Sequence, residues 1–191
     1  MRNGLLFLFL FSLAIHPIKG QTDEPKPSNF FMGHLGGGTS SIEGWSVVCA
    51  FSYERKNNEF TIRGIYNNQI GHRQVDFLGF DYYNDRFANA AVLYGRTYRK
   101  KIFFASVSVG PSLYKYTDKF LVRDTITNNW LNNDYAVNQK QCSGIGFACE
   151  VKLIALFTEE VGVSALFWSD INNCKSISGV SLALTLGILR D

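Results

Sequence analysis

The chain has 191 residues, of which 46% are hydrophobic and 15% aromatic, and its 19 basic and 16 acidic residues nearly balance. This length predicts one domain, and the near-neutral charge gives no electrostatic basis for binding nucleic acid. Glycine (17), phenylalanine (16) and tyrosine (9) are plentiful, which is typical of tightly packed β structure. Beyond the first residues, no apolar run has the length of a membrane-spanning helix.

The first twenty residues are typical of a secretory signal peptide. Arg2 supplies a positive charge, residues 5–15 form an apolar run, and Gly20 is a small residue before the expected cleavage site. The run is too short to cross a bilayer as a helix, so we expect cleavage and not anchoring. Residues 21–28 are polar and are expected to form a periplasmic lead-in to a domain over 29–191.

Apolar side chains then alternate with small or polar ones, and this period of two predicts β-strands. Glycine dilutes the pattern in the first strand and leaves its choice of face open. In the fourth strand we place Val92 and Tyr94 outward and Ala91 inward. In chain order, the expected strands cover residues 29–38, 45–54, 60–67, 87–98, 103–114, 144–155, 161–169 and 179–189.

The last strand indicates the environment of the sheet. One of its faces, from Val180 to Ile188, is wholly aliphatic, and the opposite face carries only Gly, Ser, Ala and Thr. A soluble sheet would place Lys, Glu or Arg on its solvent face. The pattern therefore predicts an all-β fold, a closed antiparallel eight-stranded transmembrane β-barrel with its apolar faces toward lipid. The alternative is a secreted lipocalin-like barrel, whose apolar faces would surround a ligand.

The connections alternate in length, and the two longest are residues 69–86 and 117–141. Short periplasmic turns and long extracellular loops are typical of outer-membrane barrels, so we expect the bacterial outer membrane, with both termini periplasmic. Aromatic residues in the long loops are either contacts for a surface partner or part of an interfacial aromatic girdle. These contact candidates are Phe77, Phe80, Tyr82, Tyr83, Trp130 and Tyr135.

Four segments carry a family resemblance: residues 44–54 (GWSVVCAFSYE), 91–96 (AVLYGR), 106–114 (SVSVGPSLY) and 179–189 (GVSLALTLGIL). With them the chain resembles the small eight-stranded outer-membrane β-barrel family, of the OmpA transmembrane-domain and OmpX type. The resemblance implies a monomer surrounded by outer-membrane lipids and inserted by the barrel-insertion machinery. Family members usually end in an aromatic residue that this machinery reads, whereas this chain ends in Leu189, Arg190 and Asp191.

Four charged residues fall on the expected inward faces: Glu54, Arg63, Glu150 and Lys152. Side chains fill the interior of an eight-stranded barrel, so buried charges there must pair or bind water. We expect an internal salt-bridge plug, in which Glu54 pairs with Arg63 because both lie near the same turn. A proton path or a gated pore is the alternative interpretation.

Cys142 and Cys174 lie at the ends of loops, where a disulfide is compatible with an oxidising compartment. Sequence alone does not fix the connectivity. Cys49 and Cys149 fall on lipid-facing positions and are expected to act as small hydrophobic residues. No pair of cysteines has the spacing of a metal site.

Some eight-stranded outer-membrane barrels are lipid A acylhydrolases or acyltransferases, which makes a lipid-modifying enzyme the runner-up function. Of the histidines outside the signal peptide, His34 and His72, neither stands in a His-x-Ser arrangement. We therefore expect a non-enzymatic scaffold with no catalytic residue, metal or cofactor. Its expected role is to present loops for envelope integrity or surface interaction.

Overall fold

The computed structural model describes the backbone of residues 29–42, 44–75, 79–100, 102–123, 135–158 and 160–190. It describes side chains over residues 29–42, 44–69, 85–99, 102–118, 139–158 and 160–187. The expected signal peptide and periplasmic lead-in lie outside these residues.

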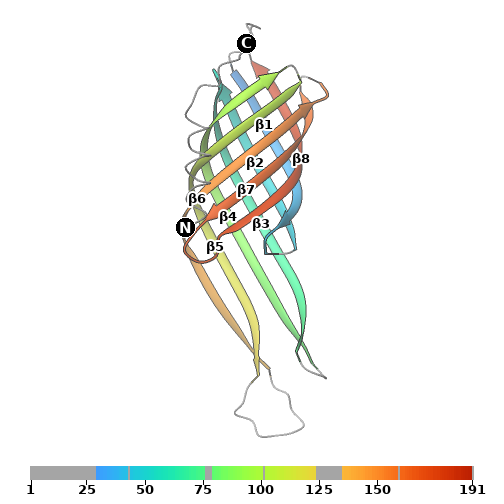
Figure 1. Ribbon diagram of the computed structural model, residues 1–191, viewed down its shortest axis with the longest axis vertical. Helices are drawn as coiled ribbons and strands as arrows, with labels where there is room; N and C mark the ends of the chain where they lie inside the picture. The colour runs from blue at the N-terminus through green and yellow to red at the C-terminus, as the bar shows by residue number, and fades with distance from the viewer. Residues whose placement is uncertain are drawn as a thin grey trace.

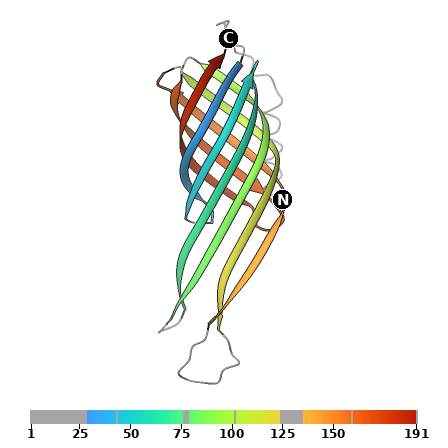
Figure 2. The same cartoon turned by 180° about the vertical axis from the view of Figure 1, so that it is seen from behind.

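Eight antiparallel strands form a closed barrel (Figures 1 and 2). Each strand pairs with its neighbours in sequence, and β1 closes the barrel by pairing with β8 along its whole length. This confirms the predicted fold class. The strands are β1 (Asn29–Ser40), β2 (Trp45–Arg55), β3 (Asn58–Val75), β4 (Gly79–Lys100), β5 (Phe103–Arg123), β6 (Tyr135–Leu156), β7 (Val161–Ile171) and β8 (Ile177–Arg190).

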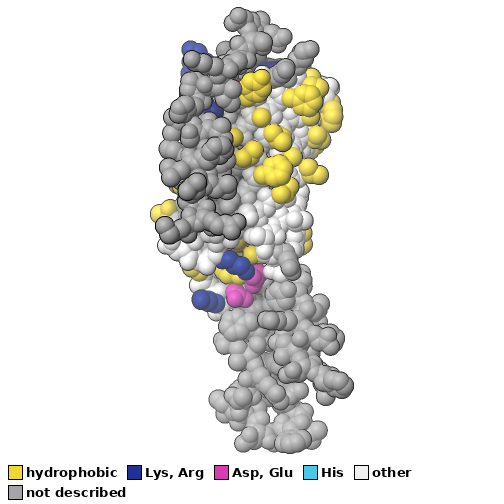
Figure 3. Space-filling model, viewed as in Figure 1, with side chains coloured by type: hydrophobic (Ala, Val, Ile, Leu, Met, Phe, Trp, Pro, Cys, Tyr) yellow, Lys and Arg dark blue, Asp and Glu magenta, His cyan; other side chains and the backbone are white. Residues whose placement is uncertain are grey.

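Many apolar side chains lie on the outside of the barrel, and Figure 3 shows a group of them on one face. Leu35, Ile62 and Leu182 are 63%, 65% and 70% exposed, whereas inward residues such as Arg63 and Lys152 are fully buried. This arrangement suits a barrel surrounded by lipid, and the lipocalin-like alternative is wrong because its apolar faces would point inward. Among the described residues, no helix has the length and apolar character needed to cross a membrane.

The structure also settles the faces of the first and fourth strands. Phe30 and Met32 of β1 point into the barrel, which leaves Phe31 outside. In β4, Val92 and Tyr94 face outward and Ala91 inward, as predicted.

The turn between β2 and β3 consists of two residues, Lys56 and Asn57, with φ angles of 49° and 66°. Both lie in the left-handed region, which gives a tight hairpin turn whose twist matches that of the flanking strands. Arg55 and Asn58 are paired directly beside the turn. This turn fixes the register of the β2–β3 ladder, and therefore which charged residues point inward.

The predicted loops over 69–86 and 117–141 are wrong over most of their length. β3 and β4 remain paired from Asn68↔Arg86 to Val75↔Gly79, and β5 and β6 from Thr117↔Gln141 to Arg123↔Tyr135. These extensions form two β-ribbons that project beyond the barrel (Figure 2). The sequences of the ribbons predicted loops because a ribbon outside the membrane needs no apolar side facing lipid. The alternation of apolar and polar residues that marks a membrane strand is therefore lost.

Inside the barrel, the two larger apolar clusters form a layer at each end. We call the end where Asn29 and Arg190 pair the terminal end, and the opposite end the ribbon end. The layer at the terminal end is formed by Phe30, Met32, Phe104, Ile154 and Leu156. The layer at the ribbon end is formed by Ile42, Val48, Ile65, Phe87, Tyr114, Trp168 and Ile177.

Candidate functional site

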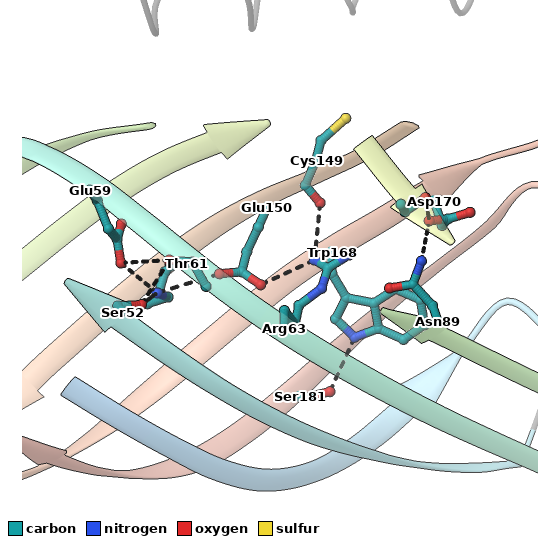
Figure 4. A network of polar contacts seen from close by, with 12 residues as sticks. Ser52, Glu59, Thr61, Arg63, Asn89, Cys149, Glu150, Trp168, Asp170 and Ser181 are labelled. Carbon is teal, nitrogen blue, oxygen red and sulfur yellow. Dashed lines mark hydrogen bonds and ion pairs between the residues drawn. The ribbon is translucent and has the colours of Figure 1, made fainter. Parts of the chain in front are cut away.

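Four charged side chains form a connected network in the middle of the barrel (Figure 4). Lys152 Nζ lies 2.7 Å from Glu59 Oε1 and 3.5 Å from Glu150 Oε1. Arg63 Nη1 lies 3.1 Å from Glu150 Oε2, so Glu150 joins the two cations. All four side chains are fully buried, and their formal charges cancel. The network therefore places no net charge in the barrel interior.

The expected pairing of Glu54 with Arg63 is wrong. In the β2–β3 ladder Glu54 stands opposite Glu59, whereas Arg63 stands opposite Ala50, four residues further along. That separation amounts to roughly 13 Å of strand. Arg63 instead reaches Glu150 on β6, and Glu54 accepts a hydrogen bond of 2.7 Å from Thr97 Oγ1. Contacts across the narrow interior thus replace the expected contact between adjacent strands.

Sequence reasoning missed Glu59, which holds one end of the network. Glu59 lies two residues after the turn and one residue before the predicted strand over 60–67, so that strand does not include it. Glu59 stands four residues before Arg63, whose inward direction was predicted, so the strand period of two could have identified Glu59 as inward.

Another carboxylate, Asp170, follows the predicted strand over 161–169 but lies in β7 and is fully buried. Its Oδ2 accepts hydrogen bonds from Asn89 Nδ2 at 2.5 Å and from Ser112 Oγ at 2.6 Å. Its Oδ1 accepts one from Asn172 Nδ2 at 3.0 Å. Asp170 therefore ties together β4, β5 and the segment that follows β7.

That segment, residues 172–176, closes the ribbon end of the barrel. The side-chain oxygen of Asn172 accepts hydrogen bonds from the backbone N–H groups of Cys174 and Lys175, which folds the segment into a turn. Lys175 Nζ then reaches Asp85 Oδ2 at 3.0 Å and the Tyr116 hydroxyl at 3.2 Å. Because β4 and β5 lie across the barrel from β7 and β8, the segment spans the mouth.

Cys174 of this segment forms a disulfide with Cys142 of β6, with the two Cα atoms 6.3 Å apart. The β6–β7 ladder ends at Phe147↔Ile171, so the disulfide joins the two elements beyond their last backbone pair. Both cysteines also pack against the apolar layer at the ribbon end. The bond therefore holds the closing segment over that layer.

The polar residues beneath Lys175 mark the point where the two ribbons separate. The Tyr116 hydroxyl donates a hydrogen bond of 2.6 Å to Asp85 Oδ2. Burial, together with this bond to a carboxylate, raises the pKa of Tyr116 far above its usual range. Burial and the nearby Asp85 carboxylate also raise the pKa of Asp118, an effect that the cations Lys175 and Lys140 oppose. We call the cluster of Asp85, Tyr116, Asp118 and Lys175 the fork.

His34 lies inside the barrel wall and is 2% exposed. Its Nδ1 is 3.0 Å from Thr185 Oγ1 and 3.4 Å from Ser164 Oγ. A histidine and a serine therefore meet there, but a buried position offers a lipid substrate no route to them. The side chain of His72 lies outside the described residues, among which no cluster of metal-ligating side chains occurs.

Four of the six aromatic contact candidates lie in described strands of the ribbons. Phe77 and Trp130 lie outside the described residues. The backbones of the other four belong to strands: Phe80, Tyr82 and Tyr83 to β4, and Tyr135 to β6. Their side chains lie outside the described part of the chain.

Two solved structures illustrate the shared fold. The chain is similar to a major outer membrane protein from Thermus thermophilus, with a TM-score of 0.58, 7% identity, and coverage of 84% of this chain and 100% of that one. It is also similar to Neisserial surface protein A (NspA), with a TM-score of 0.51, 10% identity, and coverage of 87% and 100%. A scan against protein-family models and a search of curated proteins find no match. The protein thus has the fold of the small eight-stranded outer-membrane β-barrels that its sequence resembles.

Proposed function

We propose that this protein is a non-enzymatic scaffold in the bacterial outer membrane, which binds a macromolecular surface partner through its two β-ribbons. The termini would face the periplasm and the ribbons the exterior. Outer-membrane lipids would surround a monomeric barrel that the barrel-insertion machinery has placed there. The projection of the ribbons beyond the apolar wall is the observation that carries this proposal (Figure 1).

The ribbons have strand edges that are unpaired within the described part of the chain. The last pair between β4 and β5 is Arg86↔Thr117, although β4 begins at Gly79 and β5 continues to Arg123. Likewise β6 begins at Tyr135, twelve positions before its first pair with β7 at Phe147. The stretches 79–85, 118–123 and 135–146 therefore each have a strand partner on one side.

An unpaired edge presents a row of backbone N–H and C=O groups that can accept a further strand. Proteins use such edges to bind extended peptides, with backbone hydrogen bonds providing affinity and alternate side chains providing specificity. The closed wall of the barrel has no such edge, since β1 pairs with β8. The partner favoured by this geometry is a protein with an extended segment.

Site-specific photo-crosslinking in intact cells tests the proposal. Tyr82 and Tyr135 would each be replaced by a photo-reactive phenylalanine analogue, with Tyr94 as the matched control. Tyr94 is on β4 but faces lipid on the barrel wall, where it is 48% exposed. We expect protein adducts from the two ribbon positions and none from Tyr94. If the ribbon positions give only the products seen at Tyr94, the proposal is wrong.

Ribbon-trimmed variants separate binding from folding. Gln69 and Asp85 are paired across the first ribbon, and Thr117 and Gln141 across the second. Joining each pair through Asn-Gly would keep the register and supply a favoured two-residue turn. Trimmed barrels in the envelope fraction should still shift in SDS gels on boiling, because the closed wall has no edge from which to unravel, but should lose the partner. A trimmed protein that still captured the partner would contradict the proposal.

A further inference from the structure

A groove of about 500 Å³ crosses the outer wall where β6, β7, β8 and β1 run side by side near the ribbon end. Its volume falls within the roughly 300–1,000 Å³ typical of small-molecule pockets. Strand register decides which side chains line it. Phe167 of β7 pairs with Val180 of β8, which in turn pairs with Thr39 of β1.

Two residues closer to the ribbon end, the side chains that line the groove change from apolar to polar. Ser169 pairs with Ser178, whose carbonyl accepts a hydrogen bond of 2.7 Å from the Ser41 N–H. Ser169 of β7, Ser178 of β8 and Ser41, which directly follows β1, therefore lie side by side, two positions from Phe167 and Val180. The groove is thus apolar toward the middle of the barrel and lined by hydroxyl groups toward the ribbon end.

The groove offers no charge to a ligand among its described lining residues. Glu150 contributes to the lining, but its side chain points into the barrel, is 1% exposed, and is paired with Arg63 and Lys152. On the face shown in Figure 3, charged side chains lie near the base of the ribbons and at the terminal end. A phosphate group would find no cation in the groove to pair with.

We infer that this groove binds a membrane lipid with an uncharged sugar headgroup. The acyl chain would lie along Phe167 and Val180, where the wall is already lipid-facing. The sugar would meet Ser169 and Ser178, because serine hydroxyls both donate and accept hydrogen bonds, as sugar hydroxyls do. From the middle of the barrel toward the ribbon end, the lining is first apolar and then carries hydroxyl groups. This order matches an acyl chain followed by a sugar headgroup.

Native mass spectrometry of the protein released from nanodiscs tests this inference. The nanodiscs would contain phosphatidylglycerol, phosphatidylethanolamine and monogalactosyl diacylglycerol, the last as the probe. Both leaflets carry the probe, so the result does not depend on which end of the barrel faces outward. We expect the galactolipid to be retained well above its share of the bilayer. Preferential retention of phosphatidylglycerol, or retention in proportion to composition, would overturn the inference.

Two variants locate the binding. Ser169→Ala combined with Ser178→Ala removes two hydroxyls without adding bulk, and it should lower galactolipid enrichment about tenfold. Ser143→Ala on β6, which removes an exposed hydroxyl outside the groove, should leave enrichment unchanged. The heat-dependent gel shift verifies that each variant is folded. Equal enrichment in the double variant and in wild type would show that the groove is not the site.

Discussion

The buried charge network should make Lys152 one of the most sensitive positions in the barrel. Lys152→Met keeps a long side chain but removes the cation that pairs with Glu59, and it leaves Glu150 paired with Arg63 alone. Removing one partner from a fully buried ion pair typically costs about 3–5 kcal/mol, because an uncompensated charge stays behind. With a urea dependence of about 2 kcal/mol per molar, a loss of about 4 kcal/mol lowers the unfolding midpoint by about 2 M.

Reversible urea unfolding in phospholipid vesicles, followed by tryptophan fluorescence, measures this loss. Combining Lys152→Met with Glu59→Gln removes one charge of each sign and leaves the Arg63–Glu150 pair, so it should recover more than half of the lost stability. Lys115→Met on the exposed face of β5 is the matched control and should stay within about 0.5 kcal/mol of wild type. The explanation fails if Lys152→Met is as stable as wild type. It also fails if the double variant is no better than the single one.

Three further predictions concern the disulfide, the fork and the strand contacts. Replacing Cys142 and Cys174 by Ala opens a loop with a sequence separation of 32, and the free energy of unfolding in urea should fall by about 3–4 kcal/mol. An unchanged free energy of unfolding would show that the disulfide does not constrain the unfolded chain. The pKa of Asp118 is raised in the folded protein, so Asp118 holds its proton more tightly there than in the unfolded chain. Lowering the pH through the pKa of Asp118 should therefore stabilise the protein. Asp118→Asn should flatten this pH dependence, and an unchanged pH profile of the urea midpoint in this variant would contradict the explanation. A methyl group on Gly36 would collide with the backbone of β8, so Gly36→Ala should lower stability by about 1–3 kcal/mol. At Gly33 the nearest contact of an added methyl group is a phenylalanine ring at 3.7 Å, so Gly33→Ala should be near neutral. Equal losses of stability in the two variants would refute the steric argument.

Side-chain alternation was sufficient to predict the barrel. A membrane strand must present apolar groups to lipid and polar or small groups to the interior, so a period of two in the sequence reports both the strand and its two faces. The faces of the last strand and of the fourth were predicted from this pattern alone. The inward direction of Arg63, Glu150 and Lys152 followed from it as well.

The ribbons could not be predicted in this way, because the signal disappears where the strands leave the membrane. Residues 69–86 show no regular alternation of apolar and polar residues, and only the backbone pairing of 69–75 with 79–85 shows that these segments are strands. Pairing is a property of two segments together. Local sequence therefore favoured loops in a region where the structure has continuous ladders.

The identity of the charged partners also depended on the tertiary structure. Sequence could indicate that Arg63 points inward, but strand register moved Glu54 away from it and barrel closure brought Glu150 of β6 within 3.1 Å. The same closure carried Lys175 across the mouth to Asp85. Where the alternation is clear, the sequence alone thus determined which side chains face the interior, because that depends on a local period of two. Only the closed barrel decided which of them meet, because those contacts join strands far apart in the chain.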